Sequence, residues 1–146
     1  MHVAWNTIAQ IQSNPIQHTA KLRNDILDYC ATYPNVGLRY HKSDIILHID
    51  ADASYLVAPY AKSRFTGLFQ LTPNSSTHFN NVLILIVCKT LKYVATSSTE
   101  CETAAVFHNA QRAIPICYIL QQLGHPQPPT PITLDNSSTH NFYQKQ

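Results

Sequence analysis

The sequence predicts an α/β protein of the α+β kind, in which a long helix packs on a mixed sheet. Short runs rich in β-branched and aromatic residues recur between residues 36 and 88. A long helical segment follows over residues 100–123, and a last short apolar run occupies residues 132–135. This order favours a three-stranded antiparallel meander, then a long helix, then one further strand.

The first helix is expected from about Ile16 to Ala31. Pro15 suits a first helical turn, and apolar residues such as Ile26 and Leu27 recur at a spacing that places them on one broad side. The sequence "YPN" then ends the helix. We therefore expect residues 1–35 to form an N-terminal helical segment and residues 36–146 to form the main domain.

Four runs carry the strand signal before the long helix. Val36–Tyr40 alternates apolar and polar residues, and Ile45–Asp52 is rich in β-branched residues, so the two are predicted to pair as a hairpin that ends at the aspartates. Phe65–Leu71 is the next expected strand. Val82–Cys88 is continuously aliphatic, which favours a strand buried on both faces.

The long helix is predicted from Glu100 to about Leu123. Serine and threonine residues before it can cap its start, and Gly124 can end it. Pro115 is expected to kink the helix or to divide it. After a proline-rich connection, Ile132–Asp135 is expected to form the last strand.

Composition narrows the class of protein. The 146 residues fit one domain with a real core, since 45% are hydrophobic and 12% are charged. A formal net charge of +2 is too small to indicate nucleic-acid binding by itself. The four cysteines are irregularly spaced, which argues against a structural zinc site. With no secretory signal and no apolar run long enough for a bilayer, the protein is expected to be soluble and intracellular.

Acidic residues are few and clustered. The chain has eight, and five of them fall in three short groups: Asp50 and Asp52, Glu100 and Glu102, and Asp135. Residues two apart in a strand share a face, so Asp50 and Asp52 are expected to point the same way. On a helical wheel Glu102 lies with the apolar stripe toward the sheet. Glu100 falls on the opposite side, where its negative charge is expected to stabilise the first turn of the helix.

Carboxylates converging from two strands and a helix would supply the hard oxygen ligands that Mg²⁺ and Mn²⁺ prefer. Two such ions about 3.5 to 4 Å apart can activate water and stabilise the leaving oxygen of a phosphodiester. Two other interpretations stay open. Acids at strand ends and helix starts often cap backbone groups, and they can also bind a structural Ca²⁺, although no EF-hand-like loop is present.

The chain resembles the ribonuclease H domain of copia-type retrotransposon polyproteins. The motifs that carry the resemblance are "DASYL" (Asp52–Leu56), "AKSR" (Ala61–Arg64), "SSTECE" (Ser97–Glu102), "NAQRAIPI" with "LGHPQPPTPI" (Asn109–Ile132) and "DNSS" (Asp135–Ser138). They cover nearly the whole chain from about Tyr29 in a specific order. Residues 1–35 would then be the end of a preceding reverse transcriptase region.

The resemblance implies a ribonuclease H-like fold and hydrolysis of the RNA strand of RNA:DNA hybrids during reverse transcription. It places the catalytic and metal-binding carboxylates at Asp52, Glu102 and Asp135, with Mg²⁺ or Mn²⁺ as cofactor and Asp50 as an additional acid. It also implies the reverse transcriptase and integrase regions of the same polyprotein as partners. The protein would act in the cytoplasm, in a virus-like particle or in the nucleus, with no membrane involved.

The sequence departs from this family at its end. The family has a fourth carboxylate, often with a histidine, after another helix and strand, whereas this sequence stops at Gln146 and His140 does not match. We therefore expect a C-terminally truncated domain. Loss of one ligand would weaken metal binding, so the alternative is a catalytically inactive remnant that keeps the fold and weak nucleic-acid binding.

Four basic residues are candidates for contacting the phosphates of a hybrid: Lys62, Arg64, Lys89 and Lys92. They fall in or beside the expected connections between strands, where charge alone could hold a duplex. An ordinary solvated surface explains the same residues equally well.

Overall fold

The computed structural model describes residues 2–12, 16–37, 39–73, 81 and 83–134. The chain divides into two compact units, residues 1–38 and residues 39–146. Each unit is described by itself below.

The N-terminal unit is a pair of helices, α1 (His2–Gln10) and α2 (Gln17–Thr32). The second agrees closely with the helix expected from Ile16 to Ala31, whereas the first was not predicted. Ile26 is buried, and it lines a hollow that also includes Ala4 of α1 and Leu22 of α2. The two helices therefore pack through a small apolar contact.

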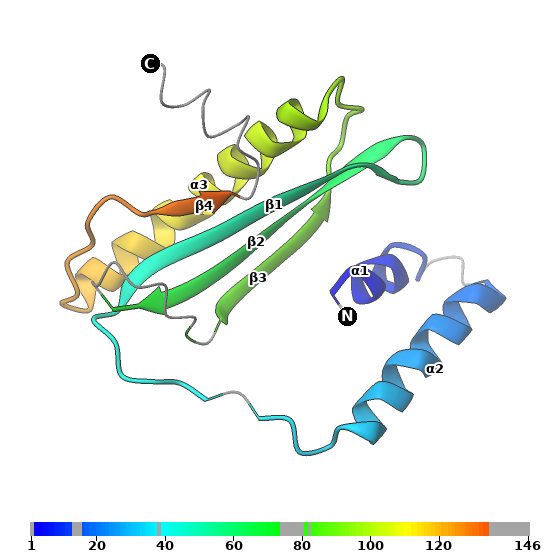
Figure 1. Ribbon diagram of the computed structural model, residues 1–146, viewed down its shortest axis with the longest axis horizontal. Helices are drawn as coiled ribbons and strands as arrows, with labels where there is room; N and C mark the ends of the chain where they lie inside the picture. The colour runs from blue at the N-terminus through cyan, green and yellow to red at the C-terminus, as the bar shows by residue number, and fades with distance from the viewer. Residues whose placement is uncertain (1, 13–15, 38, 74–80, 82, 135–146) are drawn as a thin grey trace. The chain divides into compact units, whose positions relative to one another are not determined.

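The main unit contains a four-stranded mixed sheet, with the strand order β3-β2-β1-β4. Its strands are β1 (Ile46–Ala58), β2 (Lys62–Thr72), β3 (Leu83–Thr90) and β4 (Ile132–Leu134). The first three form an antiparallel meander, and β4 runs parallel to β1 (Figure 1). The α+β class, the three-stranded meander and the additional strand after the helix are confirmed.

The predicted hairpin of Val36–Tyr40 with the next strand is wrong. The described residues of that segment are not in a strand, and Val36 and Tyr40 are 71% and 68% exposed. The reason lies in β1, which has β2 on one side and β4 on the other. Residues 36–40 could pair with β1 only along an edge that no other strand occupies. Alternation of apolar and polar residues is therefore not sufficient to make them a strand.

The prediction that the strand over Ile45–Asp52 ends at the aspartates is also wrong. Pairing with β2 continues past Asp52, with Ser54 opposite Arg64 and Ala58 opposite Lys62. The sequence "SYLVA" after the aspartates is rich in residues that favour strands. Asp50 and Asp52 consequently lie within β1 rather than in a loop.

The third strand is not buried on both faces as predicted. β3 lies at one end of the strand order, and Ile84 and Leu85 are 41% and 37% exposed. Val87, in contrast, is buried in the core. A continuous aliphatic run therefore marks an edge strand here, because a single helix covers one face of the sheet in the described part of the chain.

That helix is α3 (Ser98–Gln122), which lies behind the sheet in Figure 1. Its buried face packs with alternate residues of the strands to form the core, which includes Leu47, Ile49, Phe65, Phe69, Val87, Leu91, Cys101, Ala105, Ala113 and Leu120. Pro115 lies inside α3, and the helix continues unbroken through it. The alternative that Pro115 divides the helix is therefore wrong, since buried residues on both sides keep it on the sheet.

The proline-rich connection after α3 is held along the edge of β1. The Gln127 side chain accepts a hydrogen bond from the Leu47 N–H (3.0 Å) and donates one to the Ile45 carbonyl (2.9 Å). Further along, the Ile49 N–H donates to the Pro131 carbonyl (3.1 Å). The side-chain amide thus continues the ladder of β1 until β4 begins.

None of the helices in the described part of the chain combines the length and the apolar character that a membrane span requires.

Candidate carboxylate site

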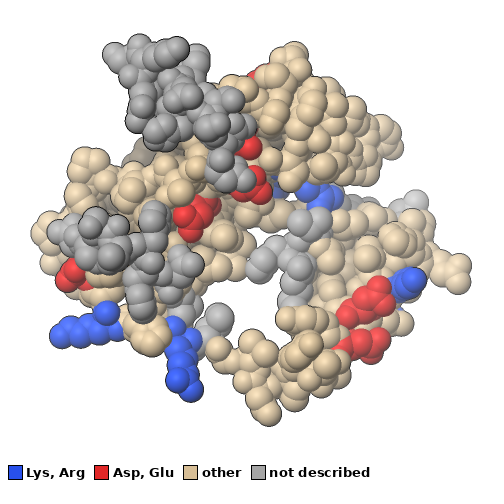
Figure 2. All heavy atoms as spheres, viewed as in Figure 1, with Lys and Arg blue, Asp and Glu red and all other residues tan. Residues whose placement is uncertain are grey.

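The two aspartates of β1 point away from α3. Successive strand residues alternate between faces, and Leu47 and Ile49 belong to the core beneath α3. His48, Asp50 and Asp52 therefore lie on the other side, which we call the outer face. Carboxylates are visible over β1 near β4 in the space-filling view (Figure 2). The prediction that Asp50 and Asp52 share a face is confirmed.

Asp50 is held by hydrogen bonds to both of its carboxylate oxygens. His48 Nε2 lies 3.1 Å from Asp50 Oδ1, and Gln70 Nε2 donates to Asp50 Oδ2 at 2.8 Å. His48 Nε2 also lies 3.0 Å from the Thr133 hydroxyl. Three strands, β4, β1 and β2, thus contribute to one polar network around Asp50.

Asp52 is exposed, two residues further along the same face. It lies opposite Thr66 of β2. A hollow of about 380 Å³ opens beside it, lined by Asp50, Ala51, Asp52, Thr66, Leu68, Thr133 and Leu134. Asp52 therefore places an accessible carboxylate in a concave part of the outer face, where a cation and a phosphate could enter together.

Glu102 lies on the side of α3 that packs against the sheet, as the wheel predicts. Its side chain is buried, at 4% exposure, among neighbours such as Cys101 and Ala105 in the same turns of the helix. A buried carboxylate is unfavourable unless its charge is compensated. The burial of Glu102 therefore requires compensation of its charge, either by a bound cation or by structural partners.

Glu100 caps the start of α3. Its carboxylate accepts hydrogen bonds from the Thr96 N–H (2.7 Å) and the Thr96 hydroxyl (2.8 Å), and its own N–H donates to Ser97 Oγ at 3.1 Å. The Thr96 backbone N–H, followed by the Thr96 hydroxyl, lowers the pKa of Glu100 below its ordinary value. The prediction of a helix-start charge is confirmed: Ser97 is the N-cap, and the Glu100 carboxylate bonds Thr96, the residue before it.

The structure does not bring the predicted carboxylates into one cluster. Asp52 lies on the outer face, whereas Glu102 lies beneath α3 on the opposite side of the sheet. Within the described ranges, no group of three His, Cys, Asp or Glu residues is arranged to hold a metal ion. Asp135 lies outside the described residues. The three-carboxylate site and its Mg²⁺ or Mn²⁺ therefore stay predictions.

The pairing of β4 with β1 relates Asp52 to Asp135 in register only. β4 runs parallel to β1, with Leu134 opposite Ala51. Asp52 follows Ala51 in the sequence, and Asp135 follows Leu134.

The four basic candidates differ in exposure. Lys89 of β3 and Lys92 after it are exposed, and Lys62 is partly exposed at the start of β2. Arg64, in contrast, is 8% exposed. Lys89 and Lys92 thus offer accessible cations, whereas Arg64 belongs to the folded interior.

The sequence did not predict three polar residues that support the sheet around the site: Gln70, Thr133 and Asn109. Gln70 and Thr133 join the network around Asp50 through pairing that no local pattern reveals. Asn109 of α3 is fully buried and donates to the Thr66 carbonyl at 3.0 Å. A signal was available only for His48, because a histidine two residues before an aspartate shares its face in a strand.

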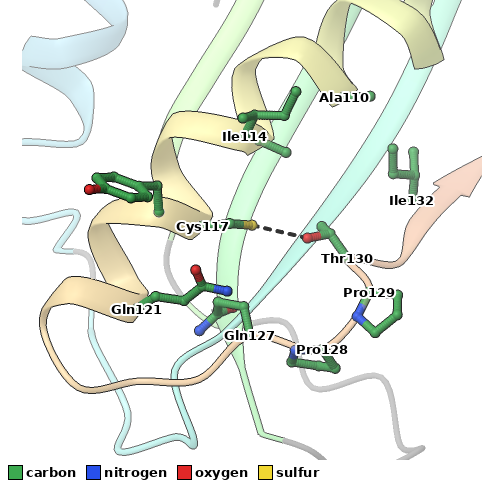
Figure 3. Close-up of a pocket in the computed structure, with 11 residues that line it drawn as sticks. Ala110, Ile114, Cys117, Gln121, Gln127, Pro128, Pro129, Thr130 and Ile132 are labelled. Carbon is green, nitrogen blue, oxygen red and sulfur yellow. Dashed lines mark hydrogen bonds between the residues drawn. The ribbon is translucent and has the colours of Figure 1, made fainter.

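A larger hollow lies between α3 and the proline-rich connection (Figure 3). It measures about 670 Å³, and residues such as Ile114, Pro128 and Ile132 make its wall mostly apolar. The Cys117 thiol and the Thr130 hydroxyl form a hydrogen bond of 3.2 Å inside it. No carboxylate of the described residues lines this hollow, so it does not extend the candidate site.

Comparison of the chain with protein-family models, with curated proteins and with solved structures finds no match.

Proposed function

We propose that the main unit is a ribonuclease H-like domain that hydrolyses the RNA strand of RNA:DNA hybrids with the help of a divalent cation. The observation that carries the proposal is Asp52, an exposed carboxylate in a hollow of the outer face. It follows Ala51, the last residue of β1 that pairs with the described part of the parallel strand β4. The order of motifs from Asp52 to Asp135, which carries the family resemblance, also supports the proposal.

Mg²⁺ bound at this edge would supply Lewis acidity and an activated water for in-line attack on a phosphodiester. Asp52 is the residue best placed to hold it, with Asp135 and Glu102 as the proposed additional ligands. Asp50 is less suited, since both of its oxygens already accept hydrogen bonds. The donor set is made of hard oxygens, which fits Mg²⁺ or Mn²⁺ better than softer metals.

Substrate binding would rest mainly on charge. Lys89 and Lys92 present exposed ammonium groups, and such groups neutralise phosphates without reading sequence. In the proposed setting the hybrid is a product of reverse transcription. The reverse transcriptase and integrase regions of the same polyprotein are then the proposed partners.

A second candidate is a catalytically inactive form of the same domain that keeps the fold and weak affinity for nucleic acid. The placement of Asp52 and Glu102 on opposite sides of the sheet favours it. A shared metal requires both carboxylates to reach one ion, although the sheet separates them. If that does not occur, one carboxylate on the outer face is too few for tight Mg²⁺ binding.

A cleavage assay separates the two candidates. The full chain is incubated with a labelled RNA:DNA hybrid, with and without Mg²⁺, and compared with Asp52→Asn and with Asp28→Asn. Asp28 is an exposed aspartate of α2 and serves as a matched control. If the domain is an enzyme, we expect cleavage that depends on Mg²⁺. This cleavage should be lost in Asp52→Asn and kept in Asp28→Asn. Absence of cleavage together with retained hybrid binding supports the inactive form.

A further inference from the structure

The described part of β4 pairs with β1 and lies at the end of the strand order. Its three described residues each pair with β1. A side-chain interaction between β4 and β1 would therefore help to fix β4 at the edge where the proposed site lies.

The network around Asp50 provides such an interaction. Thr133 is the central residue of β4, and its hydroxyl lies 3.0 Å from His48 Nε2. His48 and Gln70 are buried, at 8% and 3% exposure. Buried polar groups of this kind are fixed by their partners, because water is not present to replace them.

The chemistry of the carboxylate determines which imidazole nitrogen carries the proton. An ionised Asp50 can only accept hydrogen bonds, so His48 Nε2 must carry hydrogen to interact with Asp50 Oδ1 at 3.1 Å. Thr133 Oγ1 then shares the same N–H as a second acceptor. The Gln70 amide donates to the remaining oxygen, Oδ2. Asp50 thereby orients the imidazole that holds β4.

The geometry points to His48 and Asp50 as positioning residues that clamp β4 against β1 through Thr133. The catalytic consequence rests on the proposed function: the clamp would hold β4 in register with β1 beside Asp52. Asp50 then acts by holding His48 rather than by binding the metal. The clamp itself does not depend on whether the protein is an enzyme.

Hydrogen exchange tests the clamp directly. We would compare wild type with His48→Leu, Thr133→Val and His48→Gln, following the peptides that cover residues 128–134 and Ile49. Loss of this part-buried hydrogen bond should raise local exchange by up to about tenfold. His48→Gln, which keeps an N–H donor on a similar side chain, should restore much of the protection. Thr72→Val is the matched control, since the Thr72 hydroxyl donates to the Ile46 carbonyl away from β4.

The expected result is faster exchange in residues 130–134 and at the Ile49 amide that donates to Pro131, in His48→Leu and Thr133→Val, and unchanged exchange there in Thr72→Val. Equal exchange in wild type and Thr133→Val overturns the clamp, as does an increase of the same size throughout β2 and β3. Thr133→Val keeps the test valid if His48→Leu does not fold.

A second readout separates the clamp from the proposed function. If wild type cleaves hybrid, the Mg²⁺ concentration for half-maximal cleavage should rise about tenfold in His48→Leu and recover in His48→Gln. An unchanged Mg²⁺ requirement overturns the positioning role at the site. If wild type does not cleave, the proposed function fails, while the exchange experiment still decides whether the clamp exists.

Discussion

Asp52 of β1 and Glu102 of α3 lie on opposite sides of one sheet, the first exposed and the second 4% exposed. Both were expected to hold the same metal ion. The strand pairing explains the difference, because Asp52 alternates with the core residues beneath α3 while Glu102 belongs to the buried face of that helix. In this arrangement the sheet separates the two carboxylates.

Glu102→Gln tests whether Glu102 is a ligand or a buried structural residue. The substitution keeps the side-chain shape and removes the charge. For a ligand, we expect hybrid cleavage to fall by at least the roughly 10- to 100-fold that loss of a supporting residue costs, with unfolding little changed. For a structural residue, urea unfolding changes while cleavage per folded molecule does not. Cleavage rates and urea titrations of the same preparations distinguish these outcomes.

Ser97→Ala tests the cap of α3. Ser97 Oγ accepts the Glu100 N–H, and removal of such a cap costs about 1 kcal/mol of stability. Thermal or urea unfolding of the variant measures this loss. Thr103→Ala is the control, because the Thr103 hydroxyl also bonds a helix backbone group, the Thr99 carbonyl, but does not cap the helix. Equal stability of Ser97→Ala and wild type would contradict the cap.

Glu100 gives α3 a predictable response to acid. Its pKa is lowered from 4.5 by the hydrogen bonds from Thr96. A group with a lowered folded-state pKa contributes stability above its unfolded pKa and loses that contribution as the pH falls through the folded value. Unfolding of wild type and Glu100→Gln, measured between pH 7 and the acid limit, should therefore converge below about pH 4.5. A difference that persists at low pH would contradict this explanation.

Gly67→Ala tests how closely α3 approaches β2. A Cβ at Gly67 would overlap the Asn109 side chain, which is fully buried and bonded to the Thr66 carbonyl. Overpacking of this kind costs about 1 to 3 kcal/mol. Gly37→Ala is the control, because no atom lies within 4 Å of a Cβ there. The loss should shrink when Asn109→Ala is combined with Gly67→Ala, and an equal loss in both backgrounds would contradict the overlap.

Sequence patterns correctly predicted the helices and strands that are determined by neighbouring residues in the chain. The helix after Ile16, the capped helix of α3 and the strand around Phe65 follow from periodicity, caps and β-branched residues. Residues 36–40 did not form a strand because pairing depends on a free edge, which no window of sequence contains. The exposure of β3 likewise depends on which strands end the sheet.

The predictions for the candidate site also separate into those that rest on local geometry and those that depend on chain topology. Alternation placed Asp50 and Asp52 on one face, and the wheel placed Glu102 toward the sheet, since both rest on local geometry. The side of the sheet that α3 covers is a matter of chain topology, and the sequence pattern of β1 does not encode it. For this reason the convergence of the acids could be predicted only through the family resemblance.

The central claim is that a divalent cation binds at Asp52 on the outer face, and paramagnetic broadening by Mn²⁺ tests it most directly. NMR spectra of the isotope-labelled 146-residue chain would be recorded during a Mn²⁺ titration, for wild type and for Asp52→Asn. We predict early broadening of the amide signals of residues 51–53 and Thr66, which Asp52→Asn abolishes. Broadening that is equal in both proteins, or that begins elsewhere in the chain, would contradict a metal site at Asp52.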